Sequence, residues 1–255
     1  MARILSIDLA YTTYEKFGAC RIEGAGRPPW KTEFVKPRLL GLSGVPAPAA
    51  CAEALARWCA AEGIEVLLLD GPQGWKDPRR ALSGYRQCER ELHCPAKTGT
   101  EGKVLPASYR PFVEFSIALF TALAGRWGMT LLSRSAPRPR ASVLLVESFP
   151  HAAWKGLGLP PLPAKARCPP EEVDRRSDLL HARLGLERAP RASHDEVQAL
   201  AAGAAGPALA RIPPGEIPGD NVEGCTLAGL DPLPSGRGYF LEGLIAVPDG
   251  GSTYP

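Results

Sequence analysis

Short apolar runs recur along the chain, and several carry an acidic residue at or near their end. Ile4–Leu9, Val66–Asp70 and Val143–Glu147 are almost entirely aliphatic, a pattern typical of strands covered on both faces of a sheet. Two further runs, Phe17–Ile22 and Trp30–Val35, are joined by a Gly- and Pro-rich turn. They predict a hairpin that continues the first strand as an antiparallel meander.

Two longer stretches place apolar residues at helical spacing. The first runs from Ala49 to Glu62 and ends at Gly63. The second begins at Pro111, a residue type favoured in the first turn of a helix, and runs to Trp127. A strand, a helix and a second buried strand nearly always form a right-handed parallel crossover, so we expect strands 4–9 and 66–70 to be parallel.

A polar and basic segment, Lys76–Arg110, separates the second buried strand from the second helix. Only Tyr85–Leu92 within it is predicted to be helical. The segment is either a solvated surface loop or a loop that binds a polyanion at the edge of the sheet.

The second half of the chain predicts three more helices. Phe149–Trp154 follows the third buried strand, and Glu171–Leu184 is charged on one face. Ser193 and Glu196 have the spacing of a capping box, which begins a tightly packed helix through the small residues 197–205.

From Pro207 onward the chain is rich in Pro and Gly, and only Tyr239–Val247 is predicted to be a strand there. We find no internal repeat and no composition shift that would mark a second folded unit. We therefore expect a single domain over residues 1–255, with a C-terminal extension over about 207–255.

The composition is that of an ordinary globular protein, with 45% hydrophobic residues and a net charge of +3. This excludes disorder of the whole chain, and the charge is too small to indicate a nucleic-acid partner by itself. The first acid is Asp8, and Ala, Gly and Pro interrupt the apolar runs well before the length of a membrane span. We therefore expect a cytoplasmic protein with no membrane partner.

The seven cysteines are scattered and form no C-x-x-C pair, which argues against a disulfide framework and against a zinc ribbon. Cys88, His93 and Cys94 lie close in sequence but lack the second ligand pair of a zinc site. We expect reduced, structural thiols.

Four acids form the candidate site. Asp8, Asp70 and Glu147 each lie at or near the end of a buried strand, and Asp195 lies in a first helical turn. Carboxylates gathered at one edge of a sheet either have raised pKa values or bind hard cations such as Mg²⁺ or Mn²⁺. Such ions activate water for phosphodiester hydrolysis. The alternative is that two of the four acids are caps or ion-paired surface groups.

Six short motifs follow one another over nearly the whole chain: Ile7-Asp8-Leu9-Ala10, Leu69-Asp70-Gly71-Pro72, Arg86-x-Cys88-Glu89, Val146-Glu147-Ser148-Phe149-Pro150-His151, Ser193-His194-Asp195 and Glu242-Gly243-Leu244-Ile245. In this order they resemble the DUF429 family, described as predicted nucleases with an RNase H-like fold. The resemblance implies an α/β fold with a mixed five-stranded sheet in the order 3-2-1-4-5 and helices on both faces. It also implies that Asp8, Asp70, Glu147 and Asp195 occupy the positions of metal-binding acids.

One position departs from the family pattern. Family members often carry a second acid three residues after the helix acid, and this chain has Gln198 there. An amide still offers a carbonyl oxygen, but one negative charge is lost. The number of metal ions, one or two, is therefore left open.

The leading hypothesis is a metal-dependent nuclease or phosphodiesterase that acts on nucleic acid, with Asp8 and Asp70 as core ligands. The alternative is a non-catalytic binding module on the same fold. An ATP-dependent kinase of the actin-like fold is disfavoured because the turn after Asp8 has no glycine. A Cys/His hydrolase is disfavoured because no cysteine lies at a nucleophile elbow. His194 is either a proton shuttle or a capping residue.

Overall fold

The computed structural model describes residues 1–25, 27–80, 84–138, 140–186 and 192–250. Residue 26, in the predicted turn between the second and third strands, and residues 251–255 of the expected extension lie outside these ranges. No helix in the described part of the chain combines the length and apolar composition needed to cross a membrane.

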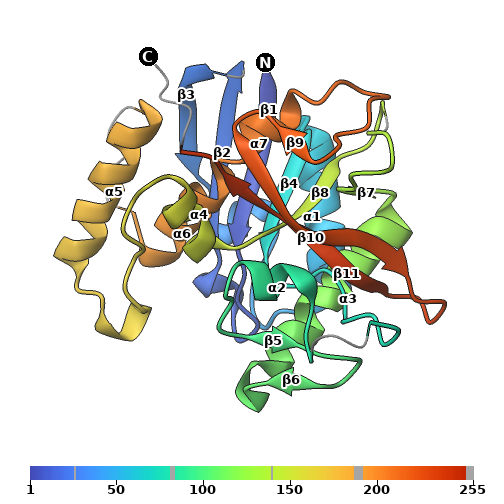
Figure 1. Cartoon of the computed structure of the whole chain (residues 1–255). Helices are drawn as coiled ribbons and strands as arrows, with labels where there is room; N and C mark the ends of the chain where they lie inside the picture. Colours follow the sequence, from blue (N-terminus) through green and yellow to red (C-terminus); the bar gives the residue numbers. More distant parts are fainter. Residues whose placement is uncertain (26, 81–83, 139, 187–191, 251–255) are drawn as a thin grey trace.

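The predicted five-stranded order is present (Figure 1). Strands β1, β2 and β3 form the antiparallel meander, and β4 and β8 follow β1 in parallel pairings. These strands span Ala2–Asp8, Gly18–Ala25, Arg27–Phe34, Val66–Asp70 and Leu144–Ser148. The order β3-β2-β1-β4-β8 and these directions confirm the RNase H-like α/β fold expected from the resemblance.

The sheet continues beyond β8 into the C-terminal part of the chain. Strand β11 (Phe240–Pro248) is parallel to β8, and β10 (Cys225–Pro234) and β9 (Asn221–Val222) follow it. The expectation of a single strand after residue 207 was therefore wrong, because β9, β10 and β11 all form there. Gly and Pro residues break the apolar pattern of β10, so periodicity did not reveal it.

The far edge of β8 is shared by two strands. Its first half pairs with β7 (Thr130–Leu131), and its second half pairs with β11. Strand β11 therefore lies beside Glu147 and Ser148, at the end of the sheet where the candidate acids lie.

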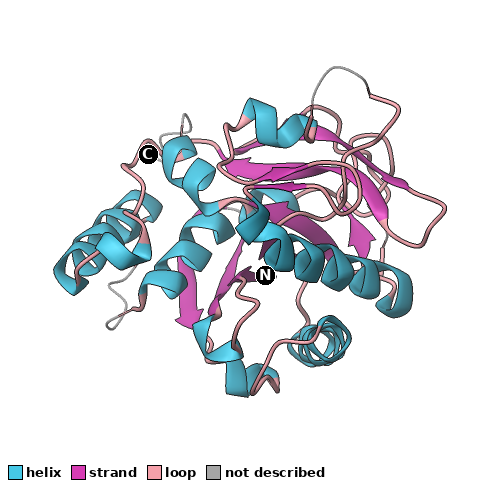
Figure 2. Ribbon diagram, turned by 90° about the horizontal axis from the view of Figure 1, so that it is seen from below, coloured by secondary structure: helices cyan, strands magenta, loops and turns pink. Residues whose placement is uncertain are grey.

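Helices cover both faces of the sheet, as predicted (Figure 2). Helices α1 (Pro48–Glu62) and α3 (Arg110–Trp127) pack on one face, against β-strand residues such as Leu5, Leu67 and Leu145. The opposite face is covered by α4 (Pro150–Gly156), α5 (Pro170–Leu184), α6 (His194–Gly203) and α7 (Gly206–Ala210). Short 3₁₀ turns occupy Tyr14–Lys16, Pro37–Leu40, Ala107–Tyr109 and Lys165–Arg167.

The basic segment between β4 and α3 is folded rather than a solvated loop. It contains α2 (Gln87–Glu91) and a small hairpin of β5 (Lys97–Thr98) and β6 (Val104–Leu105). Four of its charged residues are buried and have partners within the protein: Lys76, Asp77, Arg86 and Glu89. Most of its basic residues are exposed, among them Arg79, Arg80, Arg90, Lys103 and Arg110.

The capping box of α6 is confirmed. The Ser193 hydroxyl accepts a hydrogen bond from the Glu196 amide at 3.3 Å, and the Glu196 carboxylate accepts one from the Ser193 amide at 2.8 Å. Gly203 and Gly206 face β1 so closely that an added Cβ would lie within 3 Å of Ser6 or Ile4. Small residues therefore bring α6 and α7 directly against the sheet.

All seven cysteines are free thiols, and all except Cys168 are buried. Burial raises the pKa of Cys51 and of Cys59 to about 12. Such thiols act as small apolar core residues rather than nucleophiles.

Candidate active site

Asp8 and Asp70 lie side by side at the ends of two parallel strands. Ile7 of β1 is in register with Leu69 of β4, so the next residue of each strand is an aspartate. The two carboxyl groups lie within side-chain hydrogen-bond reach of each other. The crossover rule therefore placed these two acids correctly.

The pKa values of both carboxyl groups are raised. Burial is the main cause for Asp8, followed by the negative charge of Asp70, their hydrogen bond and the charge of Asp195. Burial also raises the pKa of Asp70 to about 7, and the charge of Glu147 adds to this, although the hydrogen bond from Asp8 opposes it. Both shifts favour the protonated form of these acids, and a bound cation would oppose them.

This pKa shift makes stability depend on pH. A carboxyl whose pKa is raised on folding binds more protons in the folded state, so the free energy of unfolding should fall as pH rises from 3.8 to about 7. The slope for one group is at most about 1.4 kcal/mol per pH unit. Urea denaturation in EDTA across this range measures it. The Asp70→Asn variant should have a flatter profile, and an unchanged slope would show that Asp70 is not the group responsible.

Asp195 lies in the first turn of α6, close enough for its charge to raise the pKa of Asp8. Its carboxylate forms an ion pair with Lys165 and a 3.4 Å contact with His194 Nδ1. Burial raises the pKa of Asp195, but the hydrogen bonds from His194 and Lys165 outweigh this and lower it below the ordinary value. His194 Nε2 also contacts the Pro163 carbonyl at 2.9 Å, so both ring nitrogens have partners.

Gly18 allows α6 to approach the acidic pair. It lies opposite Asp8 in the β1–β2 ladder, and a Cβ added to it would lie 2.0 Å from the Asp195 carbonyl oxygen. Neither Gly18 nor Lys165 stands out in the sequence, and both are recognised only from the structure.

Gly18→Ala should therefore destabilise the protein, because a Cβ cannot fit unless the start of α6 moves away. We expect a loss of about 1–3 kcal/mol in the free energy of unfolding, typical of overpacking. The matched control is Gly125→Ala in α3, where an added Cβ meets nothing within 4 Å. That variant should gain about 0.5–1 kcal/mol from higher helix propensity. Urea denaturation of the two variants measures these changes in the free energy of unfolding. Equal changes in both variants would contradict the expectation.

Glu147 is close to the pair, but an arginine holds it. It is in register with Leu69, one position before Asp70, so the alternation of a strand directs it to the opposite face. Both of its carboxylate oxygens accept hydrogen bonds from Arg86 at 2.7 Å, and one also accepts the Gln73 amide at 2.9 Å. Thus Asp8, Asp70 and Asp195 come together, while Glu147 lies beside them in an ion pair.

Arg86 is the centre of a buried network. Its side chain is 2% exposed, and its Nε donates to Glu89 at 3.1 Å in addition to the two bonds to Glu147. Glu89 in turn accepts the Thr98 amide at 2.8 Å. The Arg86-x-Cys88-Glu89 motif therefore fastens the folded basic segment to the end of β8.

Glu242 fastens the same segment to β11. It is buried and has a positive φ of 60°. Its carboxylate accepts the amides of Asp77 and Gln87, each at 3.1 Å, and its own amide donates to the Trp75 carbonyl at 2.7 Å. Next to it, an added Cβ at Gly243 would collide with Gln73. Glu242 and Gly243, which interrupt the apolar run of β11, thus hold the segment between β4 and α3 in place.

The side-chain oxygen of Gln198 is not free to bind a metal ion. Its amide oxygen accepts a 2.7 Å hydrogen bond from Trp154 Nε1. The carbonyl ligand considered for this position is therefore already engaged.

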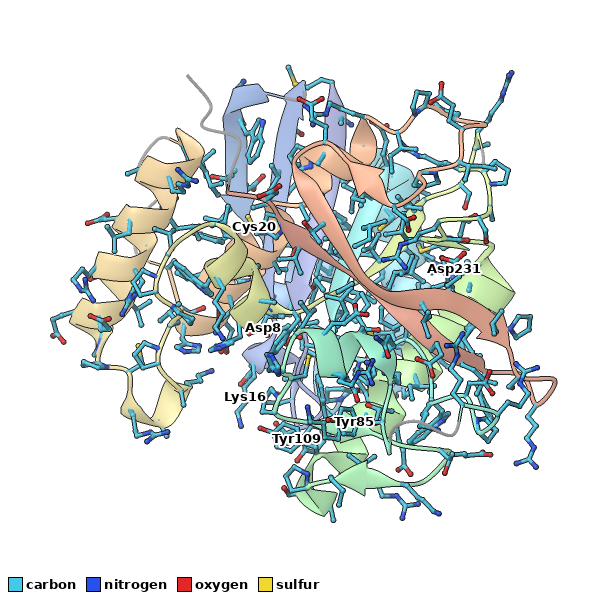
Figure 3. The ribbon with its side chains drawn as sticks, in the orientation of Figure 1. Asp8, Lys16, Cys20, Tyr85, Tyr109 and Asp231 are labelled. Carbon is cyan, nitrogen blue, oxygen red and sulfur yellow. The ribbon has the colours of Figure 1, made fainter. Side chains whose placement is uncertain are left out.

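Two hollows open beside Asp70, and both are lined by Asp70, Tyr109 and Phe112. The Tyr11 hollow has a volume of about 410 Å³ and is completed by Leu9, Ala10, Tyr11, Thr12 and Ser108. The Ser148 hollow has a volume of about 220 Å³ and extends toward Ser148, Phe149, Ile245 and the folded basic segment. In Figure 3, Asp8, Tyr85 and Tyr109 lie toward the same end of the sheet.

In the described part of the chain, no three His, Cys, Asp or Glu side chains are grouped closely enough to hold a metal ion. Lys165 and Arg86 each form an ion pair with one of the four candidate acids, Asp195 and Glu147. The arrangement brings together a carboxyl pair with raised pKa values, a third acid within electrostatic reach, and two adjoining hollows.

Comparison with known protein families identifies the family of this chain. The sequence model described as "Protein of unknown function (DUF429)" matches residues 30–212. The chain belongs to the DUF429 family. The matched range includes Asp70, Glu147 and Asp195, and Asp8 of this DUF429 protein lies before it.

Two solved structures are similar to this DUF429 protein. The Thermus thermophilus RuvC structure has a TM-score of 0.36 and 14% identity, and the likeness covers 78% of this chain and 90% of that chain. T. thermophilus RuvC in complex with Holliday junction substrate has a TM-score of 0.35 and 13% identity, with 79% and 90% covered. Curated proteins give no match.

Proposed function

We propose that this protein is a metal-dependent nuclease or phosphodiesterase that hydrolyses nucleic acid. The observation that carries the proposal is the Asp8–Asp70 pair, two hydrogen-bonded carboxyl groups with raised pKa values at the ends of neighbouring parallel strands. Ligand sites in open α/β sheets lie at this edge. Two neighbouring acids with raised pKa values are suited to a hard cation.

The candidate ligands suit Mg²⁺ or Mn²⁺ chemically, because all of them are carboxylate oxygens. Asp8 and Asp70 would hold the ion, and Asp195 would complete the set from α6. Asp195 would first have to leave Lys165, with which it forms an ion pair. Glu147 remains a predicted fourth ligand and would first have to leave Arg86. When bound, such a cation lowers the pKa of water and neutralises charge on a phosphate.

The chain's own groups have separate tasks in this proposal. Asp70 lines both hollows, so it meets a phosphodiester that enters from either one. Arg86 and the Gln73 amide both bind Glu147 and hold it against the turn after Asp70. Gly18 sets the distance of Asp195 from Asp8. Each task concerns positioning of a carboxylate before substrate arrives.

The second candidate function is a non-catalytic binding module on the same fold. One observation favours it: Lys165 and Arg86 already neutralise two of the four acids without any metal ion. In that case the charge of the site would be balanced within the protein.

Calorimetric titration with Mn²⁺ and a cleavage assay separate the two functions. The nuclease proposal expects saturable Mn²⁺ binding and cleavage of at least one substrate among DNA, RNA, hybrid and branched nucleic acids. The binding-module alternative expects neither. Mn²⁺ binding without cleavage of any substrate would also reject the nuclease proposal.

A further inference from the structure

The proposed hydrolysis does not require the Ser148 hollow, although this hollow adjoins the acidic pair. Asp70 lies on its edge, and Ser148 is in register with Asp70 across β4 and β8. Paired residues of neighbouring parallel strands direct their side chains to the same face. A group bound against Ser148 would therefore lie next to whatever Asp70 holds.

The Ser148 hydroxyl is an unused polar group. The residue is 2% exposed, and its oxygen has no hydrogen-bond partner in the described part of the chain. A buried polar group without a partner is costly, and one that lines a hollow is suited to bind a ligand. This hydroxyl both donates and accepts, so it fits the polar edge of a small ring.

The walls of the hollow specify an uncharged, flat group. Pro72, Ala96, Phe112, Phe149 and Ile245 supply apolar and aromatic surface. Of the four charged lining residues, Asp70 lies at the edge, and Arg86 binds both Glu89 and Glu147. Arg86, Glu89 and Glu147 offer no free charge to a ligand. A volume of about 220 Å³ is below the roughly 300–1,000 Å³ of sites for drug-sized molecules, so one heteroaromatic ring fits and a base pair does not.

The neighbouring Tyr11 hollow suits the strand from which such a ring would come. Tyr11 and Tyr109 are 39% and 41% exposed there, and exposed aromatic rings stack with unpaired bases. Lys16 contacts Thr12 on the rim at 3.4 Å and places a positive charge near a phosphate path. The rings of Tyr11 and Tyr109 and the ammonium group of Lys16 thus lie on the side of Asp70 that borders the Tyr11 hollow.

We propose that the Ser148 hollow binds one unpaired base of a nucleic acid, with Ser148 bonded to its edge and Tyr109 stacked beside its neighbour. The identity of the ligand as nucleic acid rests on the proposed function. The preferred substrates are then single strands and duplexes that carry an unpaired nucleotide. A fully paired duplex lacks a base that can enter.

Fluorescence anisotropy in EDTA tests this by binding alone. The probes are labelled oligothymidine, a blunt duplex, and the same duplex with a one-nucleotide bulge. Oligothymidine and the bulged duplex should bind more tightly than the blunt duplex. Equal affinity for blunt and bulged duplexes would overturn the proposal.

Substitutions of residues that line the two hollows test where the base binds. Ser148→Ala should weaken binding of the bulged duplex about two- to tenfold, the value of one hydrogen bond. Tyr109→Ala should weaken it roughly 5- to 150-fold, and Tyr109→Phe should restore most of the loss. Tyr239→Ala removes an aromatic ring outside both hollows and should leave affinity unchanged. If Ser148→Ala and Tyr109→Ala bind like the wild type, the proposal is wrong.

The two proposals fail separately. Tyr109-dependent binding of the bulged duplex without any cleavage in Mn²⁺ would reject the nuclease and keep the base site. Cleavage of blunt and bulged duplexes at equal rates, unchanged by Ser148→Ala, would reject the base site and keep the nuclease.

Discussion

Asp70→Asn is expected to lower Mn²⁺-dependent cleavage by roughly 100- to 1,000-fold. A bound cation contributes several kcal/mol of charge stabilisation in the transition state, and about 1.4 kcal/mol corresponds to a factor of ten in rate. The amide keeps the size of the carboxyl group but removes its charge, so the cation loses a ligand while the fold remains. Initial rates with a substrate that the wild type cleaves measure the effect. Asp8→Asn should behave in the same way.

The free energy of unfolding distinguishes a loss of catalysis in Asp70→Asn from misfolding of the variant. The ionised Asp70 carboxylate is unfavourable in its buried position, so above pH 7 the Asp70→Asn variant should be as stable as the wild type or more stable. Asp220→Asn is the matched control, because the Asp220 side chain is 83% exposed and pairs with Arg134. Full activity of Asp70→Asn in Mn²⁺ would rule out the proposed role of this acid.

Arg86→Met is expected to cost about 3–5 kcal/mol in the free energy of unfolding. Removal of one partner from a buried ion pair leaves the other charge unpaired, and here two carboxylates, Glu147 and Glu89, lose the same guanidinium. Met keeps much of the side-chain volume, so loss of charge rather than of packing dominates. Urea denaturation at pH 7 measures the difference.

The control for Arg86 is Arg110→Met. Arg110 also pairs with a glutamate at 2.7 Å, but its side chain is 55% exposed. Exposed pairs contribute about 0–1 kcal/mol, so this variant should stay close to the wild type. Adding Glu147→Gln to Arg86→Met should recover part of the loss. Equal costs for Arg86→Met and Arg110→Met would show that burial of the network is not what makes it important.

Much of the fold was predictable because its signals are local. The aliphatic strands around Asp8 and Asp70 flank one amphipathic helix, and the crossover rule then fixes their direction. Strand β10 gave no such signal. Its pairing with β11 and its burial come from contacts far along the chain, while its own Gly and Pro residues contradict a strand.

The candidate site was predictable in part for the same reason. Asp8 and Asp70 follow from strand ends alone. Glu147 shows the limit of that reasoning, since a shift of one residue in register turns a side chain to the other face. Its partner Arg86 was part of a recognised motif, but no spacing rule indicates that it reaches Glu147, 61 positions away. Lys165 and Gly18 depend on three-dimensional proximity only.

The clamp made by Glu242 has a consequence for the order in which the molecule is assembled. Glu242 holds the amide of Asp77 across 165 positions of sequence. Synthesis from the N-terminus releases β1, β4 and β8, with their acids, well before β11. Contacts between such distant residues form late because a long loop must close first. A chain still on the ribosome therefore carries these acids before Glu242 can hold the segment between β4 and α3 in place.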